Sequence, residues 1–133
     1  MAAEASAMEE DAANQAPPAP PEVYLIGEAG FTPVFPKVGE AVSYYWSEAN
    51  AGGQHADTYH ARVIWKVDDR IIDDVFVDCP PLATNDSAYR TKELSAPTAA
   101  GIGYSIELWV DVDHHSNYRE GYNYAYHAVT VDD

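Results

Sequence analysis

The 133-residue chain is long enough for one ordinary domain, and its 22 acidic and 7 basic residues give it a formal charge of −15. This excess of negative charge argues against binding to nucleic acid or to an anionic membrane through a basic patch. The acidic N-terminus has no apolar segment of the signal-peptide kind, and no run of about 18 apolar residues occurs. We therefore expect no membrane insertion, and the sequence leaves the localisation open between a cell surface and a particle.

Two regions differ in composition. Residues 1–21 contain an Ala/Glu-rich piece followed by Gln-Ala-Pro-Pro-Ala-Pro-Pro, and they contain no Lys or Arg. Such a proline run favours an extended polyproline conformation, so residues 1–21 are predicted to be a flexible tail or tether. Residues 22–133 are predicted to form the folded domain. Cys79 is the only cysteine, so no disulfide can form within the chain, and it is expected to pack at a strand end.

Short alternating segments dominate residues 22–133. Polar and apolar residues alternate with the period of two that is typical of strands with one buried face, and turn residues separate the segments. Strands are predicted at residues 23–26, 41–47, 59–67, 71–72 continuing into 75–77, 88–94, 103–113 and 122–131. About seven such strands without a helical stripe predict an all-β, immunoglobulin-like antiparallel sandwich, in which Trp65 occupies the place of the buried tryptophan of such domains.

Several short motifs follow one another along the chain. They are Val38-Gly39-Glu40, residues 50–53 (Asn-Ala-Gly-Gly), residues 65–69 (Trp-Lys-Val-Asp-Asp), residues 100–111, and residues 118–123 followed by the strand that ends at Val131. In this order they resemble a CARDB domain, the cell-adhesion-related immunoglobulin-like domain of bacteria and archaea. The resemblance covers about residues 22–133. This chain departs from the family pattern at Tyr124, where a second Asn is usual, and at Asp69, where a Gly is usual. The resemblance implies the sandwich fold and a role in adhesion.

Aromatic residues provide the strongest functional prediction. The chain has ten tyrosines and three tryptophans, and alternation places some of them outward. If Ile106, Leu108 and Val110 face the core, Trp109 faces out. By the same parity, Tyr124, Tyr126 and Ile64 face out on neighbouring strands. Ile64, Trp109, Tyr124 and Tyr126 are therefore predicted to form one exposed apolar patch that binds a protein or glycan partner or mediates self-association. The competing interpretation is aromatic pairing that only stabilises the sheet, or coverage of the patch by the N-terminal tail.

The turn between the last two strands could bind a cation. Asp111, Asp113, Glu120 and Asn123 flank this turn, and calcium requires several oxygen ligands in a flexible loop. The sequence contains no EF-hand pattern, however. His114 and His115 beside Asp113 could instead hold a transition metal, although adjacent histidines are commonly exposed turn residues.

Catalytic motifs are missing from the sequence. None of the five histidines lies in an HExxH pattern, and neither a phosphate-binding glycine loop nor a nucleophile elbow occurs. We therefore expect a non-catalytic adhesion or recognition module without a required cofactor. Two alternatives stay open, namely a structural decoration or accessory protein of a virus particle or other large assembly, and a metal-dependent protein or enzyme built on the C-terminal turn.

Overall fold

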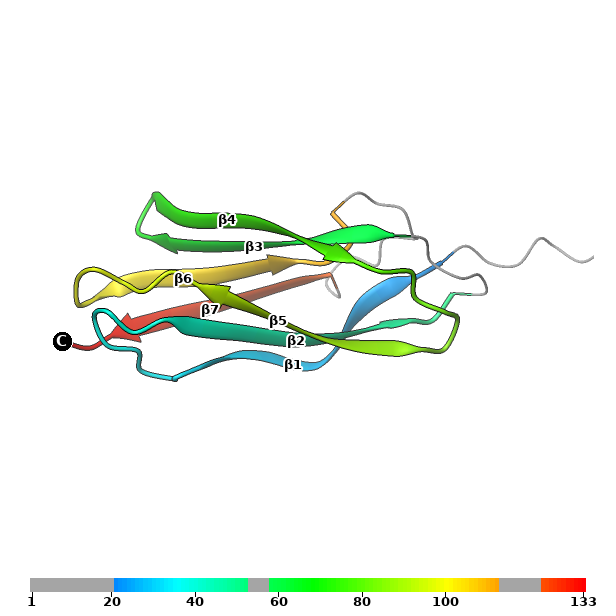
Figure 1. The fold of residues 1–133 in the computed structure, drawn as a ribbon, viewed down its shortest axis with the longest axis horizontal. Coiled ribbons are helices and arrows are strands. Elements are labelled where there is room, and N and C mark those ends of the chain that lie inside the picture. Colours follow the sequence, from blue (N-terminus) through cyan, green and yellow to red (C-terminus); the bar gives the residue numbers. More distant parts are fainter. Residues whose placement is uncertain (1–20, 53–57, 113–122) are drawn as a thin grey trace, which may run out of the picture.

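The strands pair into two antiparallel sheets in the computed structural model (Figure 1). The structure describes residues 21–52, 58–112 and 123–133. The described strands are β1 (Val23–Thr32), β2 (Val42–Asn50), β3 (Tyr59–Val67), β4 (Arg70–Cys79), β5 (Ser87–Leu94), β6 (Gly101–Trp109) and β7 (Tyr124–Val131). One sheet has the order β1-β2-β5 and the other β4-β3-β6-β7. The predicted immunoglobulin-like sandwich is confirmed. None of the described residues forms a helix of the length and hydropathy needed to cross a membrane.

The core consists of the inward positions of both sheets. Trp46 of β2 and Trp65 of β3 are fully buried, and so are Ile106 and Leu108 of β6. Full burial of such side chains contributes roughly 1.5–3 kcal/mol each, so the alternation sets both the strand pairing and the face that each strand presents to solvent. The predicted inward positions of β2, β3 and β6 are confirmed.

The strand bounds differ from the prediction in several places, and β6 runs from Gly101 to Trp109 where residues 103–113 were predicted. β1 continues to Thr32 through a bulge between Ile26 and Gly30, because Gly27 adopts a positive φ of 66° that lets the strand bend without ending. β2 extends to Asn50. β4 is one strand of 10 residues, and its pairing with β3 shifts at a bulge next to Trp65.

Two buried asparagines fix the start of β1 to the end of the sandwich. Asn50 and Asn123 are both fully buried. The Asn50 side-chain oxygen accepts a hydrogen bond from the Glu22 amide at 2.9 Å, and the Asn123 side-chain nitrogen donates to the Val23 carbonyl at 2.8 Å. These bonds give the Glu22 amide and the Val23 carbonyl a buried side-chain partner. They therefore help to fix the position at which β1 begins.

A buried ion pair lies between the sheets. Glu48 of β2 is fully buried, and its carboxylate accepts a hydrogen bond from the Arg90 guanidinium of β5. Arg90 also donates to the Tyr59 hydroxyl at 3.0 Å. Burial raises the pKa of Glu48, and the hydrogen bond and positive charge of Arg90 oppose this rise. The carboxylate thus depends on Arg90 to remain charged inside the protein.

His127 lies at the seam between β7 and the smaller sheet. The Tyr44 hydroxyl and His127 Nε2 are 3.0 Å apart, and the Phe31 ring packs edge-on against the imidazole with centroids 5.8 Å apart. Burial lowers the pKa of His127. The imidazole is therefore neutral near pH 7, and Nε2 can accept a hydrogen bond from the Tyr44 hydroxyl.

We predict that Arg90→Met destabilises the fold by about 3–5 kcal/mol, because it leaves a charged carboxylate buried without a partner. The loss should shrink as the pH falls, since a carboxyl with a raised pKa is protonated more readily in the folded state than in the unfolded state. Denaturant unfolding at pH 7 and pH 5 measures both effects. The double variant Glu48→Met/Arg90→Met is the control and should lose less stability than Arg90→Met alone.

Acidification should weaken the β1/β7 seam. The folded-state pKa of His127 lies below its unfolded value of about 6.5, so the unfolded chain takes up the proton first and the free energy of unfolding falls as the pH drops below that value. His127→Gln keeps a hydrogen-bond acceptor but does not titrate. Unfolding curves from pH 7.5 to pH 4.5 should show a smaller acid-induced loss in this variant than in the wild type. His60→Gln is the matched control, and an equal reduction in both variants would contradict the assignment.

Candidate functional site

The outer face of the four-stranded sheet presents a row of large side chains that crosses all four strands. Tyr124 of β7 lies opposite Trp109 of β6, Trp109 lies opposite Arg62 of β3, and Arg62 lies opposite Phe76 of β4. We call Tyr124, Trp109, Arg62 and Phe76 the aromatic row. Its side chains face away from the core because their neighbours in each strand, such as Leu108, face into it.

The members of the aromatic row contact one another. The rings of Trp109 and Tyr124 have centroids 4.2 Å apart, and the Arg62 guanidinium lies 5.4 Å from the centroid of the Phe76 ring. Phe76 is 57% exposed, whereas Trp109 and Tyr124 are half-buried. The row therefore combines accessible aromatic surface with side chains that are already held in place by their neighbours.

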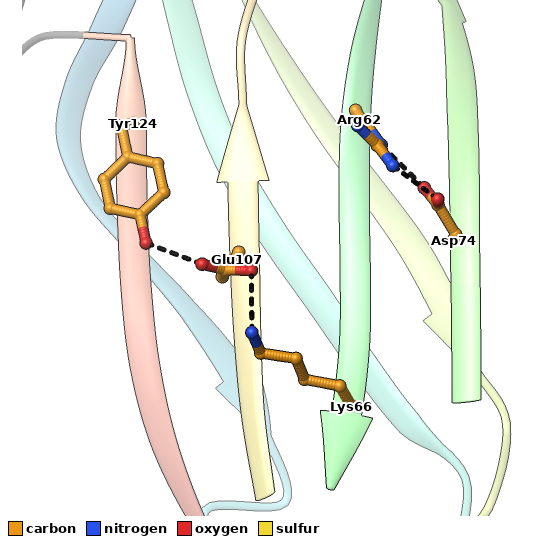
Figure 2. A network of polar contacts seen from close by, with 5 residues as sticks. All are labelled: Arg62, Lys66, Asp74, Glu107 and Tyr124. Atoms are coloured by element: carbon orange, nitrogen blue, oxygen red, sulfur yellow. Dashed lines mark hydrogen bonds and ion pairs between the residues drawn. The ribbon is translucent and has the colours of Figure 1, made fainter. Parts of the chain in front are cut away.

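Charged residues on this face pair with one another, as Figure 2 shows. Arg62 donates two hydrogen bonds to Asp74 of β4, at 2.7 and 2.5 Å. Lys66 lies 3.5 Å from Glu107 of β6. Arg62 and Lys66 thus offset Asp74 and Glu107, while the exposed Asp78 lies 3.1 Å from His60 at the next outward position of the same two strands.

The pKa values follow from these pairs. The guanidinium of Arg62, which donates to Asp74, holds the pKa of that carboxyl below its usual range. Burial, together with the hydrogen bond that Tyr124 donates to Glu107 at 2.9 Å, raises the pKa of Tyr124 to about 12. The Asp74 carboxyl is therefore charged and the Tyr124 hydroxyl is neutral across the neutral pH range.

The structure removes Ile64 from the predicted exposed patch. Trp109, Tyr124 and the 56%-exposed Tyr126 lie on the outer face, but Ile64 is only 9% exposed. It lies in β3 between Arg62 and Lys66, whose charged groups reach sideways to opposite neighbouring strands (Figure 2). The apolar stems of these long side chains therefore shield Ile64. The prediction that Ile64 is exposed is wrong.

Phe76 was missed by the sequence prediction. It alternates with Val75 and Val77, which pack against the core, and this alternation was a usable signal. The bulge between β3 and β4 prevented the parity of β4 from being assigned from Ile71 and Ile72 alone.

The predicted calcium ligands are only partly described. Asp113 and Glu120, together with His114 and His115, lie outside the described residues. Asp111 is fully buried with a φ of 53°, and the Asn123 amide nitrogen donates to the carbonyls of Val23 and Val110. Among the described residues, no three His, Cys, Asp or Glu side chains are placed to hold a metal ion. Calcium binding at this turn stays a prediction.

Cys79 borders a recess of about 370 Å³, which is lined by Thr58, Tyr59, His60, Asp78, Cys79 and Pro80. The thiol is 1% exposed, and its sulfur lies 3.7 Å from the Glu48 carboxylate. Burial, with the nearby negative charge of Glu48 as a smaller cause, raises the pKa of Cys79 to about 12. The thiol is therefore protonated at neutral pH and does not supply the thiolate that a nucleophilic cysteine needs.

Solved structures with the same fold cover most of the chain. The crystal structure of the CARDB domain of a Pyrococcus furiosus protein, in complex with di-metal ions, matches with a TM-score of 0.65 and 22% identity, over 86% of this chain and 96% of that domain. A β-glucosidase of Listeria innocua, in complex with glucose, matches with a TM-score of 0.59 and 13% identity, over 85% of this chain but only 16% of the enzyme. The sporulation control protein Spo0M of Bacillus subtilis matches with a TM-score of 0.54 and 11% identity, over 84% of this chain and 49% of Spo0M.

No protein-family model matches the chain, and a search of curated proteins found no match. The glucosidase likeness is confined to a small part of a much larger enzyme, so it extends to the fold and not to the activity. Because the structural match to the Pyrococcus furiosus CARDB domain spans nearly all of that domain, the chain has a CARDB-like, immunoglobulin-like β-sandwich fold.

Proposed function

We propose that the protein is a non-catalytic adhesion or recognition module that works at a cell or particle surface. It binds a protein or glycan partner through the outer face of the sheet β4-β3-β6-β7. The observation that supports this proposal is the aromatic row, with exposed Phe76 in the row and exposed Tyr126 beside it. Aromatic side chains bury a large area on binding and lose little conformational freedom.

The paired charges also suit this face to binding. Arg62 and Asp74 already satisfy each other, as do Lys66 and Glu107. A partner can therefore cover these residues without leaving a buried charge unpaired. An unpaired buried charge would cost roughly 3–5 kcal/mol. The excess acidic residues elsewhere on the chain disfavour non-specific association.

Incorporation into a large assembly, such as a virus particle, would use the same face in a repeated contact. The position of the first strand favours this variant of the proposal. The Val23 carbonyl accepts a hydrogen bond from Asn123, which directly precedes Tyr124 of the aromatic row. The start of the folded domain and the aromatic row thus lie at one end of the domain.

Cation binding at the turn between β6 and β7 is a second candidate function. Asp111 is a fully buried carboxylate at this turn, and its φ of 53° is unusual for a residue other than glycine. A similar domain of Pyrococcus furiosus was solved in complex with di-metal ions. Asp111 and Asn123, together with the predicted Asp113 and Glu120, would supply the oxygen ligands that calcium prefers.

Trp109→Ala should weaken partner binding at least about tenfold while lowering the free energy of unfolding by only about 0.5–1.5 kcal/mol, the usual contribution of an exposed aromatic pair. The measurement compares wild type and variant for retention of envelope, particle and polysaccharide fractions from the native source. Unfolding curves give the stability. Loss of roughly 3–5 kcal/mol, as for a core tryptophan, would instead place Trp109 in the core.

Tyr89→Ala is the matched control for this comparison. Tyr89 is 67% exposed on β5, in the other sheet, so its removal should leave retention unchanged. Equal losses of retention in both variants would show that the outer face of the larger sheet is not the binding surface.

Calcium should raise the unfolding temperature of the wild type, because a ligand that binds only the folded state stabilises it. Asp111→Asn should abolish this shift, and Glu93→Gln, at an exposed position of β5, should retain it. Thermal unfolding with millimolar calcium and with chelator measures the shift. An unchanged unfolding temperature of the wild type in calcium and magnesium would exclude the site.

A further inference from the structure

The proline run at residues 17–21 ends where the structure fixes the chain. The Glu22 amide donates to Asn50 at 2.9 Å, and the Glu22 carbonyl accepts a hydrogen bond from the Ala51 amide at 2.9 Å. Asn123 then holds Val23. Because these contacts begin one residue after Pro21, the run adjoins the domain without a flexible linker.

The repeat of a polyproline segment matches the spacing of the aromatic row. A polyproline helix rises about 3.1 Å per residue and has three residues per turn, so prolines at i and i+3 are about 9.3 Å apart on one side. Trp109 and Phe76 lie on β6 and β4 with β3 between them, and two strand spacings amount to about 9.5 Å. Residues 17–21, Pro-Pro-Ala-Pro-Pro, contain two such proline pairs, Pro17 with Pro20 and Pro18 with Pro21.

The charges favour the same contact. The proline run contains no charged residue, and on the outer face Arg62 and Lys66 offset Asp74 and Glu107. Two copies of a chain of charge −15 repel each other over most of their surface. This repulsion is reduced where an uncharged segment meets a face on which Arg62 and Lys66 are paired with carboxylates, and aromatic side chains are the usual receptors for polyproline segments.

We propose that the proline run of one copy docks across the aromatic row of a second copy. Proline-rich segments are semi-rigid spacers, and a semi-rigid run that begins beside a fixed residue does not readily fold back across its own domain. We therefore assign the run to the face of a neighbouring copy. Reciprocal exchange of two runs closes a symmetric dimer. This inference rests on the binding surface of the proposed function and names the partner as a second copy.

Tryptophan fluorescence provides a direct readout. Trp46 and Trp65 are fully buried, whereas Trp109 is half-buried on the outer face. Acrylamide quenching of the full-length chain therefore reports mainly on Trp109. Quenching should decrease as the protein concentration rises, in parallel with dimer formation in sedimentation equilibrium.

Two variants separate the docking run from the docking face. Replacement of Pro17, Pro18, Pro20 and Pro21 by serine keeps the length and charge of the chain, and Trp109→Ala keeps the run but removes the face. Each should weaken dimerisation at least about tenfold, because each removes both reciprocal contacts. A mixture of the two variants should form heterodimers, since it combines one intact run with one intact face. Tyr89→Ala should dimerise like the wild type.

The outcomes are distinct. Loss of dimerisation with Trp109→Ala but not with the serine variant, or failure of the mixture to associate, would overturn run docking in favour of face-to-face contact. Protection of Trp109 that is independent of concentration but lost in the serine variant would overturn the second copy as the occupant, because the run would then cover its own domain. A wild type that is monomeric and as strongly quenched as the serine variant would overturn the inference entirely, while leaving the face free for an external partner as first proposed.

Discussion

The structure depends on the requirement that both sheets bury every second residue in one shared core. Leu108 and Ile106 are fully buried, and this fixes the register of β6 against its neighbours. A slip of one residue would place Trp109 in the core and Leu108 in solvent. The aromatic row therefore exists because the core sets the strand register, and contacts on the outer face add only the local packing of the rings.

This same requirement explains which features the sequence could predict. Alternation was enough for the sandwich, for the buried Trp65 and for the outward direction of Trp109 and Tyr124. It could not predict the burial of Ile64, because parity assigns a direction and not an exposure. That burial depends on ion pairs of Arg62 and Lys66 with residues of the strands on either side, which no local pattern contains. Phe76 was hidden for a related reason, since a bulge interrupts the parity of its strand.

Inward polar residues show a second limit of sequence prediction. Glu48 and Asn50 continue the inward face of β2 after Trp46, yet a buried carboxylate or amide normally signals the end of a core strand. Glu48 is tolerated because Arg90 reaches it from β5, 42 positions along the chain. Asn50 is tolerated because its side chain satisfies the Glu22 amide and, at 3.0 Å, the Leu82 carbonyl. Both partners become visible only once the strands are paired.

Buried polar contacts and surface charge together distinguish one end and one face of the domain. Asn50 and Asn123 hold the start of β1 at the end of the sandwich where the aromatic row lies. The outer face contains two of the seven basic residues, Arg62 and Lys66, each paired there with a carboxylate. The rest of the chain has a large excess of acidic residues. The outer face of the larger sheet thus combines these ion pairs with exposed aromatic rings, which is the combination on which the proposed binding function rests.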